Sequence, residues 1–196
     1  MNAHRYFVLN KPINMVSQFV SSHPVRLLGD LSFPFPDGTH AIGRLDQASE
    51  GLLLLTTNKK ITRLLFQNVV PHSRTYLVQV KNKVAPQTVE QLAKGILISA
   101  PNGLKYLTSP CEVTVVEPPH YIWSLEIPPH QNVVSDWLSI TLTEGKFHQV
   151  RKMVAAVHHK CIRLIRTSIE NVSIEKVGPG EVIELTEEEF FSKLNL

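Results

Sequence analysis

The chain contains, at residues 41–56, the sequence AIGRLDQASEGLLLLT, in which a charged loop bordered by two glycines runs directly into an apolar segment. A segment as apolar as 52–56 is typical of a strand buried on both faces of a sheet. A loop attached to such a strand is held firmly at one end, where reactive side chains are often placed. Arg44, Asp46 and Glu50 are therefore candidate functional residues, although a solvated turn with a weak ion pair explains the same charges.

Further strands are predicted from β-branched or aromatic residues between turn-rich borders, at 6–9, 76–80, 112–117, 138–143, 162–165 and 182–185. Helical spacing of apolar residues predicts helices at 59–67, 86–94, 146–157 and 187–194. Segment 88–99 is interpreted as a connecting helix and turn, and the proline pairs at 118–119 and 128–129 indicate a loop or a hairpin. This mixture favours the α+β class, with a largely antiparallel sheet in one domain or in two lobes that share it.

Composition narrows the class of protein without deciding its function. Cys111 and Cys161 lie far apart and form no metal-binding pair, which is typical of reduced thiols in a cytosolic protein. The nine histidines show no metal-ligand spacing, so we expect no metal. No apolar run has the length of a signal-peptide core or a membrane helix, so we expect a cytoplasmic protein. A net charge of +3 permits binding to a polyanion but does not require it.

Three other stretches carry basic residues: NKP at 10–12, SRTYLV at 73–78 and EGKFHQVRKM at 144–153. Together with 41–56, they resemble the motifs of pseudouridine synthases of the RsuA type, in the order in which that family has them. The central family pattern is Gly-Arg-Leu-Asp, two free positions, then Ser-Glu-Gly-Leu-Leu, and every fixed position is present in this chain. The resemblance covers residues 5 to about 186.

The resemblance implies a pseudouridine synthase fold with a catalytic cleft across the sheet. It also implies an isomerase that converts a uridine of ribosomal RNA to pseudouridine without a cofactor. It assigns catalytic roles to Asp46, to Tyr76 against the target base, and to Arg151 as the cation paired with Asp46. The residues expected to contact RNA are Lys11, Arg44, Arg74, Lys146 and His148.

These roles agree with the chemistry of the side chains. A carboxylate near the sugar C1′ performs the task of the second carboxylate in a retaining glycosidase. In a closed pocket that carboxylate needs a nearby cation to stay ionised, and an arginine keeps its charge and can donate two parallel hydrogen bonds. An aromatic ring gives an extruded base a surface on which to stack. Glu50 could be a second catalytic acid, but its place at the strand favours an anchor for the loop.

Because the sequence starts close to the first motif, we expect no S4 RNA-binding domain of the kind that many RsuA-type enzymes carry. The chain therefore resembles most the short RluE-like enzymes of the large ribosomal subunit, and large-subunit RNA is the favoured partner. We expect one catalytic domain over residues 1–196, acting as a monomer and away from membranes. Two other functions fit less well. One is a non-catalytic RNA-binding or ribosome-assembly factor that keeps the fold, and the other is a hydrolytic nucleosidase acting on free nucleosides.

Overall fold

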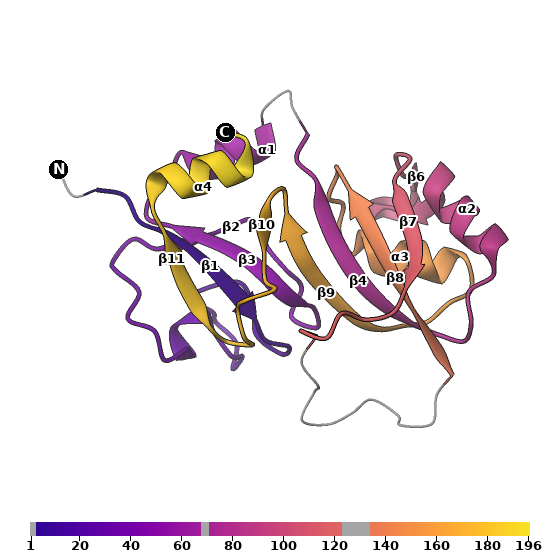
Figure 1. The fold of residues 1–196 in the computed structure, drawn as a ribbon, viewed down its shortest axis with the longest axis horizontal. Coiled ribbons are helices and arrows are strands. Elements are labelled where there is room, and N and C mark those ends of the chain that lie inside the picture. The colour runs from indigo at the N-terminus through magenta and orange to yellow at the C-terminus, as the bar shows by residue number, and fades with distance from the viewer. Residues whose placement is uncertain (1–2, 68–70, 123–133) are drawn as a thin grey trace. The chain divides into compact units, whose positions relative to one another are not determined.

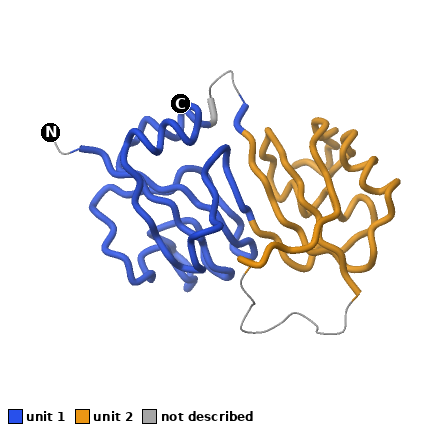
Figure 2. The backbone as a smooth tube through the Cα atoms, in the orientation of Figure 1, with its two compact units in different colours: residues 1–72, 166–196 blue, residues 73–165 orange. Residues whose placement is uncertain are grey.

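The computed structural model describes residues 3–67, 71–122 and 134–196. The chain forms two compact units, shown in Figure 2: unit 1 comprises residues 1–72 and 166–196, and unit 2 comprises residues 73–165. In the described ranges, no helix is long and apolar enough to cross a membrane. The elements labelled in Figure 1 are, in chain order, β1 (Tyr6–Lys11), β2 (His40–Ile42), β3 (Glu50–Thr56), α1 (Ile61–Gln67), β4 (Arg74–Lys81), α2 (Pro86–Lys94), β5 (Leu97–Ser99), β6 (Lys105–Leu107), β7 (Glu112–Val116), β8 (Ser135–Leu142), α3 (Gln149–Ala156), β9 (Cys161–Ile169), β10 (Val172–Ser173), β11 (Val182–Leu185) and α4 (Glu187–Leu194), with short 3-10 turns at Leu28–Asp30 and Pro101–Gly103.

Unit 1 is built around β1 and β3, which pair antiparallel over their whole lengths. Every residue of both strands is buried, which confirms the two-sided burial predicted from the apolar sequence. Strand β11 pairs with the other edge of β1, and β2 pairs with the end of β3. Helix α4 is fixed on this unit by Phe190, whose ring lies 4.6 Å from that of Tyr6. These contacts make β3 a rigid support for the loop that precedes it.

Unit 2 is built around β4 and β8, which pair antiparallel, with β7 on the far edge of β8. The apolar positions that predict a helical face, Val150, Met153 and Val154, are buried in α3. They pack in one cluster with residues of both central strands, such as Val78 and Ile140, and with Leu92 of α2. The helix thus covers one face of the β4–β8 pair, as expected for an amphipathic helix on a sheet.

The fold is α+β, and the strand pairs with assigned registers are antiparallel, as predicted. Several details differ. Helix α3 begins at Gln149 rather than at residue 146, because His148 adopts a left-handed conformation with φ 54° and ends the turn before the helix. Segment 88–99 contains the end of α2 and also strand β5. The proline pair at 118–119 lies in a loop, whereas the pair at 128–129 lies outside the described residues.

Candidate active site

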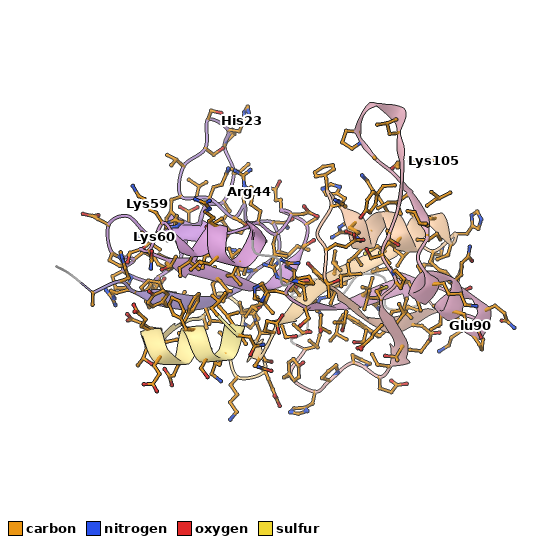
Figure 3. The ribbon with its side chains drawn as sticks, turned by 90° about the horizontal axis from the view of Figure 1, so that it is seen from above. His23, Arg44, Lys59, Lys60, Glu90 and Lys105 are labelled. Carbon is orange, nitrogen blue, oxygen red and sulfur yellow. The ribbon has the colours of Figure 1, made fainter. Side chains whose placement is uncertain are left out.

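Asp46 lies in the loop of the hairpin formed by β2 and β3. Its side chain is half-buried, whereas Arg44 in the same loop is exposed (Figure 3). The backbone N–H of Ser49 donates to the carbonyl of Asp46 at 3.0 Å, which closes a tight turn immediately before β3. The loop predicted from residues 41–56 therefore presents Asp46 at the end of the most buried strand of unit 1.

A second segment of unit 1 fixes the backbone next to Asp46. The hydroxyl of Ser17 donates to the carbonyl of Leu45 at 2.9 Å and accepts from the N–H of the same residue at 3.0 Å. The N–H of Asn14 also donates to the carbonyl of Gln47 at 2.9 Å. Both residues that flank Asp46 are thus held by the 14–17 segment. A fixed backbone keeps a reactive carboxylate in one position, so that little reorganisation is needed during reaction.

Gly51 joins this loop to β3 at a point of very close approach. It has a φ of +101°, and a Cβ atom at this position would lie 2.2 Å from the carbonyl oxygen of Arg166 in β9. The side chain of Arg166 is buried, and its Nε donates to the carbonyl of Leu52 at 2.8 Å. Only glycine fits here, because any side chain would meet backbone atoms. The glycine of the motif therefore has a steric role.

Lys11 is fully buried, with none of its surface exposed. Its Nζ donates to the carbonyls of Met15 at 2.7 Å and Pro12 at 2.9 Å, which folds the 12–15 turn around the ammonium group. The prediction that Lys11 contacts RNA phosphates stays a prediction, since in this structure the ammonium group is enclosed by its own chain. Lys11 supports the 14–17 segment that holds the Asp46 loop.

The charges around Lys11 explain why a buried lysine is tolerated. Its pKa is lowered from 10.5 to about 8, mainly because burial disfavours the charged form; the carboxylates of Glu50 and Asp46 oppose this shift, and Arg166 adds to it. Lys11 therefore remains charged at neutral pH. Glu50 is itself buried at the start of β3. The position of Glu50 beside a buried cation supports its interpretation as an anchor of the loop.

The buried lysine leads to a prediction about stability. The unfolded chain holds this proton up to pH 10.5, whereas the folded chain releases it near pH 8. Between these values the unfolded state binds more protons, so the free energy of unfolding should rise with pH, by about 3 kcal/mol in total. Chemical denaturation of the wild type and of Lys11→Met between pH 7 and 11 measures this rise. Identical pH dependences in the two proteins would contradict the assignment.

Tyr76 and Arg74 lie in β4, in unit 2. Tyr76 stands opposite Ile140 of β8, is half-buried, and packs against the cluster that includes the buried face of α3. Arg74 precedes it by two residues and is buried. Because side chains alternate along a strand, both point to the same face of β4. The predicted aromatic residue thus lies on the side of the strand that α3 covers.

Arg151 is the third residue of α3 and is half-buried. Its Nη1 donates to the sulfur of Cys161, at the start of β9, at 3.5 Å. Burial raises the pKa of the Cys161 thiol more strongly than Arg151 lowers it, so the thiol is neutral at neutral pH. A neutral thiol orients the guanidinium of Arg151 without neutralising its charge.

The turn before α3 is held by the carboxylate of Glu144. This group accepts hydrogen bonds from the hydroxyl of Tyr106, from the backbone and side chain of Ser109, and from the amide of Gln149. Burial raises the pKa of Glu144, but these hydrogen bonds outweigh it and lower the pKa below its usual value. The carboxylate thereby fixes Lys146, Phe147 and His148, which are all exposed.

The predicted site residues are divided between the two units. Unit 1 holds Lys11, Arg44, Asp46 and Glu50, and unit 2 holds Arg74, Tyr76, Lys146, His148 and Arg151. Sequence reasoning did not find Ser17 and Arg166, which support the Asp46 loop. Ser17 lies in an irregular segment with no pattern, and no signal marks it in the sequence. Among the residues described, no three histidine, cysteine or acidic side chains are grouped so that they could hold a metal ion.

Comparisons with known proteins identify the family of this chain. Residues 5–156 match the RNA pseudouridylate synthase family. The ribosomal large subunit pseudouridine synthase E of Vibrio parahaemolyticus is 34% identical over 179 residues, which cover 90% of this chain and 72% of the relative. The ribosomal small subunit pseudouridine synthase A of Escherichia coli K12 is 34% identical over 190 residues, covering 96% and 73%.

Solved structures show the same likeness. A crystal structure of a pseudouridylate synthase superposes with a TM-score of 0.76 and 28% identity, covering 99% of this chain and 75% of that one. The family match spans the Asp46 loop, Tyr76 and Arg151. The chain therefore belongs to the RNA pseudouridylate synthase family.

Proposed function

We propose that this protein is a ribosomal RNA pseudouridine synthase that uses Asp46 as its catalytic carboxylate. The observation that carries the proposal is the Asp46 loop, which has the complete family motif and is held on both sides of the aspartate by Ser17 and Asn14. Relatives that are 34% identical over about nine-tenths of the chain are named as ribosomal pseudouridine synthases, which supports ribosomal RNA as the substrate.

The reaction breaks the bond from N1 of uracil to C1′ of ribose and forms a bond from C5 to C1′. The proton lost from C5 balances the proton gained at N1, so no external reactant is consumed. Asp46 attacks C1′ or stabilises the positive charge that develops on the sugar, as a carboxylate does in a retaining glycosidase. The uracil ring turns while it remains bound, and this requires an enclosing pocket rather than a redox group.

Tyr76 and Arg151 complete the proposed chemistry. The ring of Tyr76 gives the extruded uracil a stacking surface, a contact worth roughly 1 to 3 kcal/mol per base. We also propose that its hydroxyl accepts or relays the proton that leaves C5. Arg151, oriented by Cys161, supplies the positive charge that keeps Asp46 ionised. We assign Arg74, Arg44, Lys146 and His148 to RNA binding.

A further part of the proposal is which ribosomal subunit contains the substrate RNA. Relatives from Vibrio and Xanthomonas are named for the large subunit, and they support large-subunit RNA as the substrate. The Escherichia coli relative of equal identity is named for the small subunit. Incubating the purified protein with separate large- and small-subunit transcripts, followed by mapping of pseudouridine, decides between them. We expect one modified uridine, in the large-subunit transcript. We also propose that the protein acts as a monomer and in the cytoplasm.

A substitution at Arg151 tests its role. We expect Arg151→Met to lower kcat by at least about a hundredfold, because the charge that stabilises the carboxylate is removed. Arg151→Lys should retain part of the activity, since the charge remains but the two parallel donors are lost. Single-turnover rates and RNA affinities of both variants measure these effects. If Arg151→Met instead weakened RNA affinity as much as it lowered kcat/KM and left kcat unchanged, Arg151 would be an RNA-binding residue.

A further inference from the structure

One exposed surface of unit 2 combines an aromatic ring with several cations. We call it the Phe147 surface, and it consists of Tyr106, Lys146, Phe147, His148 and Lys152. Phe147 is 67% exposed, although large apolar side chains are usually buried. Its ring is stacked on the imidazole of His148, with centroids 3.8 Å apart and an interplanar angle of 20°. The pair presents an extended aromatic surface to solvent.

Cations surround this pair and are fixed by the local structure. The Nζ of Lys152 lies 5.2 Å from the centroid of Phe147 and donates to the carbonyl of Ser99 in β5 at 2.8 Å. Ser99 stands opposite Lys105 in the β5–β6 pair, and Figure 3 labels Lys105 on this projecting hairpin. The Nζ of Lys146 lies 4.7 Å from the ring of Tyr106. The hairpin and the turn therefore bring two lysines, Lys146 and Lys152, to one aromatic surface.

The one carboxylate in this turn does not cancel the positive charge at the surface. Glu144 accepts hydrogen bonds from Tyr106, Ser109 and Gln149, so its oxygens are directed into the turn. Those hydrogen bonds also hold the turn in place before a ligand binds. The turn therefore loses less conformational entropy on binding. The surface is thus preorganised, aromatic and cationic, a combination that suits a single-stranded polyanion with flat bases.

We infer that the Phe147 surface binds a single-stranded segment of the substrate RNA outside the nucleotide that reacts, with Phe147 stacking on an unpaired base. This inference rests on the proposed function and adds a specificity-determining residue to it. Lys146 and Lys152 contact the phosphates on either side of that base, which positions the strand. A protein partner would instead use the exposed leucines of the hairpin, such as Leu107, which is 63% exposed.

Substitutions at Phe147 that distinguish the effect of the aromatic ring from the effect of side-chain size test the inference. Phe147→Ala and Phe147→Leu should both weaken binding of a substrate transcript by about five- to a hundredfold, the affinity equivalent of roughly 1 to 3 kcal/mol. Phe147→Tyr keeps the ring and should bind nearly as the wild type does. The affinity loss should appear in KM or Kd, with kcat changed less than about threefold. Wild-type affinity of Phe147→Leu would overturn the inference, because bulk without a ring would then suffice.

A matched control lies on the same hairpin. Leu107 follows Tyr106 in β6, so its side chain points to the opposite face, and Leu107→Ala should leave RNA affinity unchanged. Equal losses in Leu107→Ala and Phe147→Ala would overturn the inference. Thermal unfolding checks that both variants fold. Affinities measured in the Asp46→Asn background require no turnover, so they can fail or succeed independently of the proposed isomerase activity, which is judged by pseudouridine formation in the wild type.

Discussion

Replacing Asp46 by alanine is expected to abolish pseudouridine formation, with a fall in kcat of at least about a thousandfold. The carboxylate acts on C1′ in the transition state, and no neighbouring side chain in its loop can replace it. RNA affinity should stay within about tenfold of the wild type, because one carboxylate makes few of the contacts to a polyanion. Single-turnover assays and filter binding on the same transcript measure both quantities.

Asp46→Asn is the matched variant, since it keeps the size of the side chain and one acceptor oxygen but removes the charge. It should be as inactive as Asp46→Ala and should have the same thermal stability as the wild type. Arg44→Ala, in the same loop but exposed, should weaken RNA binding more than it lowers kcat. Appreciable turnover by Asp46→Ala would rule out Asp46 as the catalytic carboxylate.

Substitution of Gly51 is expected to cause the largest loss of stability. In Gly51→Ala the new Cβ atom would lie 2.2 Å from the carbonyl oxygen of Arg166, and its φ of +101° is itself strained for alanine. The backbone cannot move away easily, because Gly51 is paired with Lys11 of β1. We expect the free energy of unfolding to fall by roughly 3 kcal/mol or more, with loss of activity because the Asp46 loop begins at this point.

Gly38→Ala separates the two causes. Gly38 also has a positive φ, of +81°, but an added Cβ there would have nothing within 4 Å. It should cost only about 1 to 2 kcal/mol, which is the strain of the left-handed conformation alone. Urea denaturation of both variants gives the comparison. Equal losses of unfolding free energy in the two variants would show that the close approach to Arg166 does not restrict residue 51 to glycine.

The sequence predicts the Asp46 loop well because two independent signals coincide there. The leucines of 52–55 indicate a strand with both faces buried, and the structure confirms it. The glycine-bordered charges before it resemble a family motif in every fixed position. In the same way, the spacing of Val150, Met153 and Val154 predicts the face of α3 that is buried.

Lys11 shows what the sequence could not predict. A lysine before a proline at the end of a strand is expected to reach solvent. Its burial depends on the 12–15 turn, which brings two carbonyls to its ammonium group, and on the charges of Glu50 and Asp46. The hydrogen bonds to Pro12 and Met15 lie within the turn itself, whereas the charges of Glu50 and Asp46 come from a segment far away in sequence. No local pattern encodes the position of those charges.

Local conformation explains the other differences between the predicted and the observed helices and strands. His148 adopts a left-handed φ without being glycine, so the helical spacing continues in the sequence where the helix itself does not. Strands β5 and β6 have three residues each, too few to show an alternating pattern. The prediction of β9 was too short, because Arg166 interrupts the apolar run although its side chain is buried.

The central claim is that this protein converts a uridine of ribosomal RNA to pseudouridine. Its most direct test is a map of pseudouridine across the ribosomal RNA of cells that lack the protein, compared with their parent and with cells restored by the wild type or by Asp46→Ala. We predict that one uridine of the large-subunit RNA loses its modification, and that the wild type but not Asp46→Ala restores it. Identical maps in the presence and absence of the protein would contradict the claim.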